Sequence, residues 1–166
     1  MRIVNLRVAE VKKLLPPVEL KQQFPSSVEL REEIRQRRQE ISDIIHRRSK
    51  RFLVIVGPCS VHDEEAALEY ARRLSNLRKT VLDQFYIVMR IYFEKPRTTI
   101  GWKGLINDPY MDGSNDIEEG LKIARRLLHK VAEMDLPVAT EFLDPIIPQY
   151  IDDLVCWAAI GARTTE

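Results

Sequence analysis

The chain has 166 residues, which suffices for one domain with a buried core, and its 26 Lys and Arg against 25 Asp and Glu give a formal net charge of +1. This balance provides no overall field that would select nucleic acid or an anionic membrane, so an anionic ligand would have to be recognised by a local group of cations. The apolar runs are too short to cross a bilayer, and the first residues lack the apolar region of a signal peptide. We therefore expect a soluble, cytoplasmic protein with no membrane or nucleic-acid partner.

Residues 1–50 form an N-terminal extension with a pattern of its own. Residues 3–8 alternate in part between apolar and polar, which predicts an edge strand, and the Leu-Leu-Pro-Pro run at 14–17 interrupts the chain. Ser26 and Glu29 have capping-box spacing, which predicts that a helix begins there. The exposed face of this helix interleaves Arg with Glu, which favours a solvated surface over a nucleic-acid surface.

From residue 51 onward, predicted strands alternate with predicted helices. Apolar runs predict strands at 52–56, 86–92 and 137–142, and a fourth strand that begins at 160. Helical spacing and end signals predict helices at 64–80, 117–134 and 148–158. Connections of helical length between strands indicate a parallel sheet. Four such units would be half of a (β/α)8 barrel, which takes roughly 250 residues, whereas an open four-stranded sheet would be unusually small for this layout.

Each predicted strand carries a candidate functional residue at or just past its carboxyl end. These residues are Cys59, then Arg90 with Lys95 and Arg97, then Glu141, and finally Arg163. Because the carboxyl ends of parallel barrel strands open onto one face, we expect the side chains to converge there. Taken singly, Cys59 could be a packed apolar residue and Glu141 could begin a helix. Arg90 lies inside an apolar run, where a charge is costly unless it reaches a pocket or an anion.

The segment 93–115 has neither helical nor strand periodicity, which is typical of a functional loop. Within it, residues 94–99 place two cations and two hydroxyls around a proline. Such groups suit a phosphate or carboxylate ligand, and arginine can bind it with two hydrogen bonds. A solvated basic loop is the alternative.

Five motifs in these segments resemble those of 3-deoxy-D-arabino-heptulosonate 7-phosphate (DAHP) synthases of the feedback-regulated enterobacterial and yeast type. They lie at 57–63, 89–99, 101–109, 141–144 and 160–166, and the resemblance extends over essentially the whole chain. It implies a (β/α)8 barrel, a TIM barrel of the α/β class. It also implies a transferase that condenses phosphoenolpyruvate with erythrose 4-phosphate to DAHP and phosphate, at the start of the shikimate pathway to the aromatic amino acids.

The resemblance also implies roles for individual residues. Cys59 would be a ligand of an essential divalent metal ion, which could be Mn, Fe, Co or Zn. Lys95 and Glu141 would be catalytic, with Glu141 positioning a water molecule. The residues implied to bind phosphoenolpyruvate are Arg90, Lys95, Ala162 and Arg163, and those implied to bind the phosphate of erythrose 4-phosphate are Arg97 and Thr98.

Two further residues of the motifs and helices receive no ligand role from the resemblance. His62 is expected to pack within its loop, and Cys156 is expected to lie in the core on the helix over 148–158. In a reducing compartment both Cys59 and Cys156 should be free thiols.

Regulation and assembly are also implied by the resemblance. An aromatic amino acid effector would bind near Pro148 and Gln149, in a cavity that involves the extension 1–50, and the full-length enzyme would be a homodimer or homotetramer.

The family chain is about twice as long as this one, and its second half supplies the other metal ligands and two further cations for phosphoenolpyruvate. The chain therefore looks truncated, with 51–166 as the first half of a barrel, and we expect it to be inactive alone. The alternative is a non-catalytic half-barrel that pairs with a full-length paralogue.

Overall fold

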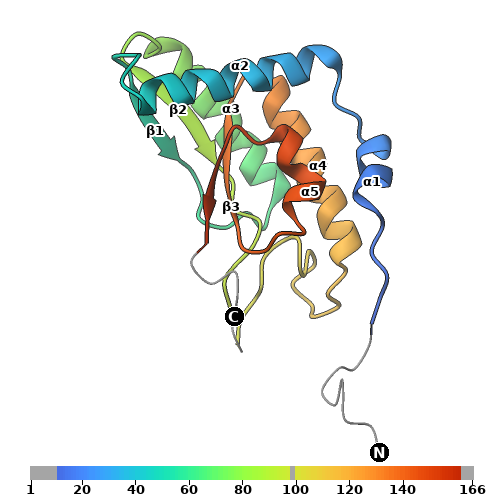
Figure 1. Cartoon of the computed structure of the whole chain (residues 1–166). Helices are drawn as coiled ribbons and strands as arrows, with labels where there is room; N and C mark the ends of the chain where they lie inside the picture. Colours follow the sequence, from blue (N-terminus) through green and yellow to red (C-terminus); the bar gives the residue numbers. More distant parts are fainter. Residues whose placement is uncertain (1–10, 98–99, 162–166) are drawn as a thin grey trace, which may run out of the picture.

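The structure, a computed structural model, describes residues 11–97 and 100–161. Four parallel strands form one sheet in the order of the sequence (Figure 1). They are β1 (Phe52–Val56), β2 (Phe85–Arg90), β3 (Val138–Phe142) and β4 (Trp157–Ile160). Val56 pairs with Met89, and Phe142 pairs with Ile160, so the carboxyl ends lie along one end of the sheet. This confirms the predicted α/β half-barrel.

Three of the helices, α2, α3 and α4, begin where a capping side chain satisfies a free backbone N–H group. They are α1 (Pro17–Gln23), α2 (Val28–Ile45), α3 (Glu64–Thr80), α4 (Ile117–Glu133), α5 (Pro148–Ile151) and the 3-10 helix η1 (Asp152–Leu154). Asp63 caps α3 and Asp116 caps α4, close to the predicted starts. The predicted cap of α2 is wrong by one residue, because Ser27 accepts from Leu30 N whereas Ser26 donates to Asp153.

The predicted helix over 148–158 is also wrong. Only α5 and η1 are helical, and the chain is extended at Val155. Cys156 N donates to Val138 O at 2.8 Å, so the chain already pairs with β3 there, and β4 begins at Trp157 rather than at 160. Cys156 is buried as expected, but it precedes a strand instead of lying on a helix.

The extension packs across the end of the sheet where the strands begin, with α2 crossing that end (Figure 1). Ile34 and Ile41 on its inner stripe are buried. The short helix α1, which the sequence did not predict, lies beside α5 and is anchored through Tyr150, whose hydroxyl donates to Leu15 O at 2.7 Å. The predicted edge strand at 3–8 lies outside the described residues.

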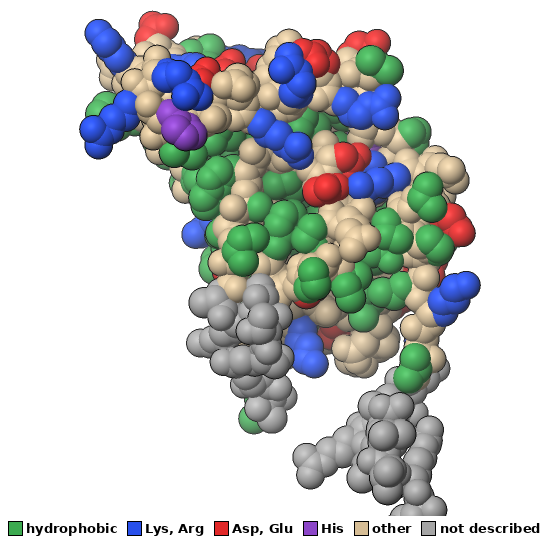
Figure 2. Space-filling view, in the orientation of Figure 1, with side chains coloured by type: hydrophobic (Ala, Val, Ile, Leu, Met, Phe, Trp, Pro, Cys, Tyr) green, Lys and Arg blue, Asp and Glu red, His purple; other side chains and the backbone are tan. Residues whose placement is uncertain are grey.

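The two outer strands leave apolar side chains uncovered. Phe52 on β1 is 69% exposed and Ile160 on β4 is 76% exposed. Figure 2 shows hydrophobic side chains gathered on the middle of one face, below the charged surface along α2. Among the described residues, no helix has both the length and the apolar character that a membrane span requires.

Candidate active site

The loop after β1 is pressed against the end of β2. A Cβ at residue 57 would collide with the carbonyl oxygen of Arg90, so glycine is required at Gly57 for this close approach. Arg90 donates to Gly57 O from Nε at 3.1 Å and from Nη2 at 2.7 Å, and its guanidinium lies 5.4 Å from the centre of the Tyr92 ring. A guanidinium has five N–H donors. Among the described residues, two of those of Arg90 are used, and they fix the side chain while the others can bind an anion.

Lys95 reaches from the loop after β2 to the loop after β1. Its Nζ donates to Cys59 O at 2.8 Å and to Cys59 Sγ at 3.0 Å. The hydrogen bond from Lys95 lowers the pKa of the Cys59 thiol, and the charges of Lys95 and Arg90 act in the same direction. Cys59 is exposed, so it is not a packed core residue. Its thiol is prepared to act as a thiolate.

The position of Lys95 depends on how its loop folds back on itself. Lys95 N donates to Lys103 O at 2.9 Å, and Glu94 forms an isolated antiparallel bridge with Gly104. Gly104 has a φ of 107°, and a Cβ there would collide with Phe93 O, so only glycine allows the two arms to meet. The predicted functional loop is therefore an ordered hairpin-like segment over its described residues.

Glu141 joins the same face from the end of β3. It pairs with Ala159 on β4, and a Cβ at Gly161 would lie 3.4 Å from Glu141 Oε1. Burial, with a smaller contribution from the Glu141 charge, raises the pKa of Tyr92. At Cys59 the Glu141 charge only partly opposes the lowering of the pKa by Lys95 and Arg90. The structure therefore brings together Cys59, Arg90, Lys95 and Glu141, as the sequence predicted.

The remaining predicted residues are either exposed in loops or lie outside the described part of the chain. Arg97 is exposed, and its Nε would lie 3.5 Å from a Cβ at Gly101. Thr98, Ala162 and Arg163 lie outside the described residues. His62 is exposed and lines a small, mainly apolar hollow at the start of α3, which agrees with a loop position.

Pro148 and Gln149 begin α5, outside this group. Gln149 borders a hollow of about 560 Å³ between α1 and α5, together with residues of the extension. The extension and the start of α5 thus line one hollow, which Gln149 borders and Pro148 does not.

Cys59 fits as one ligand of a divalent metal, since an exposed thiol of lowered pKa supplies a charged, soft donor. Within residues 11–97 and 100–161, no three His, Cys, Asp or Glu side chains are grouped closely enough to hold an ion. A complete set of ligands would require donors outside the described part of the chain.

Sequence reasoning missed Glu94 as a functional residue. Glu94 is 7% exposed, although cationic and hydroxyl residues follow it in the loop. Burial, followed by the charge of Asp144, raises the pKa of Glu94 to about 7. The signal available in the sequence was its position directly after the apolar run 91–93.

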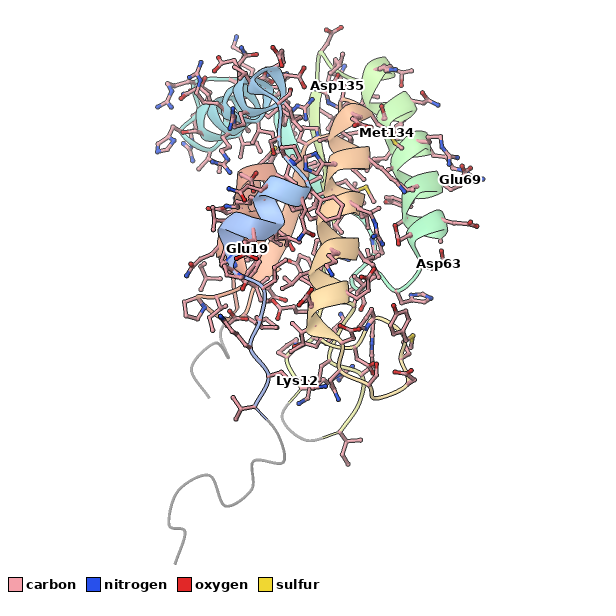
Figure 3. All side chains as sticks on the ribbon, turned by 90° about the vertical axis from the view of Figure 1, so that its right-hand side faces the viewer. Lys12, Glu19, Asp63, Glu69, Met134 and Asp135 are labelled. Carbon is pink, nitrogen blue, oxygen red and sulfur yellow. The ribbon has the colours of Figure 1, made fainter. Side chains whose placement is uncertain are left out.

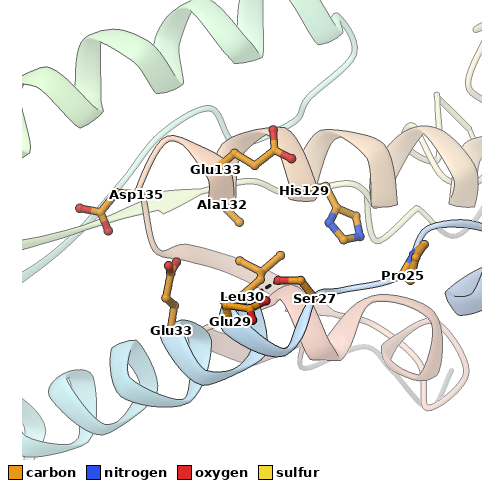
Figure 4. Close-up of a pocket in the computed structure, with 9 residues that line it drawn as sticks. All are labelled: Pro25, Ser27, Glu29, Leu30, Glu33, His129, Ala132, Glu133 and Asp135. Atoms are coloured by element: carbon orange, nitrogen blue, oxygen red, sulfur yellow. Dashed lines mark hydrogen bonds between the residues drawn. The ribbon is translucent and has the colours of Figure 1, made fainter.

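A third hollow, of about 370 Å³, lies between the start of α2 and the end of α4 (Figure 4). Its acidic lining consists of Glu29, Glu33, Glu133 and Asp135. Asp63 caps α3 directly after the β1 loop and so marks the end of the helical layer that is near that loop. Asp135, which borders the hollow, lies at the opposite end of the layer (Figure 3). Glu33 and Asp135 pair with Arg37, while Glu29 and Glu133 add negative charge far from the strand carboxyl ends. This hollow is therefore unsuited to an anionic substrate.

Comparison with known proteins points to one family. A family model described as the DAHP synthetase I family matches residues 18–166. The Tyr-sensitive phospho-2-dehydro-3-deoxyheptonate aldolase of Salmonella typhimurium is 59% identical over 162 residues, which cover 98% of this chain and 46% of that protein. The Phe-sensitive protein of Escherichia coli is 54% identical over the same shares of both chains.

A solved structure of the aldolase from Francisella tularensis matches with a TM-score of 0.90 and 51% identity, covering 95% of this chain and 46% of that one. The chain therefore spans about half the length of these relatives. The match also agrees with a partial barrel.

Proposed function

The chain belongs to the DAHP synthetase I family, and we infer that the whole protein condenses phosphoenolpyruvate with erythrose 4-phosphate to give DAHP and phosphate. The observation that carries this proposal is the group at the strand carboxyl ends, where Lys95 contacts Cys59 and Arg90 is fixed by the β1 loop. Two anionic substrates require such preorganised cations.

Each residue has a proposed part in this reaction. Arg90 and Lys95, with Ala162 and Arg163, bind the phosphate and carboxylate of phosphoenolpyruvate. A carbon–carbon bond forms between its methylene carbon and the aldehyde carbon of erythrose 4-phosphate. Glu141 positions the water that adds to the carbon carrying the phosphate, and the phosphate then leaves.

Arg97 and Thr98 hold the phosphate of erythrose 4-phosphate at the edge of the site. Cys59 would hold the divalent metal through its thiolate, and the chemistry that such an ion supplies when bound is Lewis-acid polarisation of the aldehyde oxygen. The ammonium of Lys95 lowers the pKa of Cys59 and so favours the thiolate that a metal requires.

Feedback control and assembly belong to the same proposal. The names of the relatives record sensitivity to Tyr and to Phe. An aromatic amino acid is therefore proposed as effector, bound near Pro148 and Gln149, in a cytoplasmic homodimer or homotetramer.

The test is release of phosphate from phosphoenolpyruvate by the whole protein, measured with and without erythrose 4-phosphate and with added manganese. We expect release only when both substrates are present. Lys95→Met should lower the rate about 100-fold or more, because it removes a charge from the substrate site. Lys79→Met, in the last turn of α3, is the control and should behave as wild type. Release that does not depend on erythrose 4-phosphate would contradict the proposal.

A further inference from the structure

Glu94 is a buried carboxyl group that the proposed reaction does not use. Oε1 accepts from Asn107 Nδ2 at 3.4 Å. Oε2 is buried and has no hydrogen-bond partner among the described residues. A buried carboxylate with a free oxygen is costly, so the group must either be neutral or meet a donor that arrives with a ligand.

The charges around Glu94 favour the neutral form. The charged groups that act on it from the end of β3 are Glu141 and Asp144, and both are acidic. The ammonium of Lys95, the next residue along the chain, is turned toward Cys59, and Lys103 on the opposite arm is exposed. Burial and the Asp144 charge bring the pKa of Glu94 to about 7, so its protonation changes near neutral pH.

Glu94 also connects the two arms of the loop that presents Lys95. The Asn107 amide that donates to Glu94 Oε1 donates also to Lys103 O at 3.2 Å. Lys103 O in turn accepts from Lys95 N at 2.9 Å. The Glu94 side chain thus supports, through Asn107, the backbone contact that fixes the start of Lys95.

We propose that Glu94 is a positioning residue of the synthase site: it supports, through Asn107, the loop that carries Lys95, and its charge weakens the binding of anionic substrate when it loses its proton. This inference rests on the proposed function. Ionised Glu94 would be a third negative charge beside Glu141 and Asp144, in a site that has to accept phosphate and carboxylate groups.

The experiment measures KM for phosphoenolpyruvate between pH 6 and pH 8.5 with the whole protein, for wild type and for Glu94→Gln. The glutamine keeps the size and the contact with Asn107 but cannot ionise. We expect KM of the wild type to rise about fivefold more over this range than KM of the variant, as one added charge in a partly buried site would cause. Ionisation of the substrates and of other residues affects both proteins alike and cancels in the comparison.

Two further variants separate this role from a merely structural one. Asn107→Leu removes the hydrogen bond that lowers the pKa of Glu94, so the rise in KM should move to higher pH. Glu133→Gln, an exposed position on α4, is the matched control and should follow the wild-type profile.

Parallel pH profiles for wild type and Glu94→Gln would overturn the inference, as would an unchanged midpoint in a folded Asn107→Leu protein. Either result in an active enzyme leaves the proposed function intact. A wild-type protein that releases no phosphate from the two substrates would instead overturn the proposed function, and the inference with it.

Discussion

At the scale of single residues, the contact between Lys95 Nζ and Cys59 Sγ joins two loops that are 36 positions apart in sequence. An ammonium at 3.0 Å stabilises the thiolate, so it favours the form of the cysteine that binds metals. The same contact places a cation next to the site proposed for phosphoenolpyruvate. One hydrogen bond therefore links the two parts of the proposed chemistry.

Cys59→Ala in the whole protein should abolish synthase activity and tight metal binding, because alanine supplies neither charge nor a donor atom. Metal content after dialysis against a chelator and activity after addition of manganese are the measurements. Cys156→Ala is the control, since Cys156 is a buried thiol before β4 and lies outside the site. Full activity of Cys59→Ala after the dialysis would exclude Cys59 as a ligand.

Asp153 should make the protein sensitive to acid. Burial alone would raise its pKa, but hydrogen bonds and charge from Arg125 outweigh burial and lower it to about 2, from an ordinary 3.8. A lowered folded-state pKa means that this stabilisation is complete above about pH 4 and is lost as pH falls through about 2. The shift corresponds to roughly 2 kcal/mol. Urea unfolding of wild type and Asp153→Asn between pH 5 and pH 2 should show a smaller loss of stability in the variant, and equal losses would contradict this account.

At the scale of elements, Arg125 holds the extension on the barrel. Its side chain on α4 is 0% exposed and donates to Phe24 O before α2, to Tyr150 O in α5 and to both carboxylate oxygens of Asp153. Four acceptors satisfy one buried guanidinium, so two separate segments, the extension at Phe24 and the α5–η1 stretch, are fixed to α4.

Arg125→Met in the whole protein should reduce the free energy of unfolding by about 3–5 kcal/mol, because it leaves Asp153 and two carbonyls without their donor. Arg126→Met is the matched control. Arg126 is the next residue on α4, its side chain is 38% exposed, and its nearest acidic partner is Glu119 at 3.4 Å, so the loss should stay under about 1 kcal/mol. Equal losses in the two variants would show that the buried cluster contributes little.

The effector hypothesis also belongs to this scale, because the proposed cavity lies between elements. If the whole protein is assayed with phenylalanine, tyrosine and tryptophan in turn, at least one should inhibit it. Gln149→Ala should weaken that inhibition, since Gln149 lines the hollow between α1 and α5. Gln84→Ala, exposed before β2, is the control. Full activity with all three amino acids would refute regulation of this type.

Elements with clear periodicity could be predicted from the sequence, and α3, α4 and the first three strands lie close to the expected positions. The true structure of residues 148–158 could not be predicted. The apolar residues 150, 151, 154 and 155 have helical spacing, but pairing with β3 imposes an extended chain there. Site residues at strand ends followed from parallel topology alone. The burial of Glu94 could not be predicted in this way, because it depends on the pairing of Glu94 with Gly104, ten residues further along the chain.

At the scale of the whole molecule, the sheet described here has two open edges. β1 and β4 are the outer strands, and each has a neighbour on one side within the described residues. In a closed barrel these backbones would be paired and the inward side chains covered. Phe52 and Ile160 are instead largely exposed on strands that can still accept a partner.

We therefore expect residues 1–166, expressed alone, to aggregate or to pair edge to edge and to show no synthase activity. Exposed apolar surface and free strand edges favour association. Activity should fail for a separate reason. No three His, Cys, Asp or Glu side chains group together among the described residues, and metal affinity falls with the number of donors. Light scattering gives the oligomeric state, and phosphate release from both substrates with manganese gives the activity. A monodisperse monomer with measurable turnover would show that these residues contain a complete site, contrary to the geometry of the open sheet.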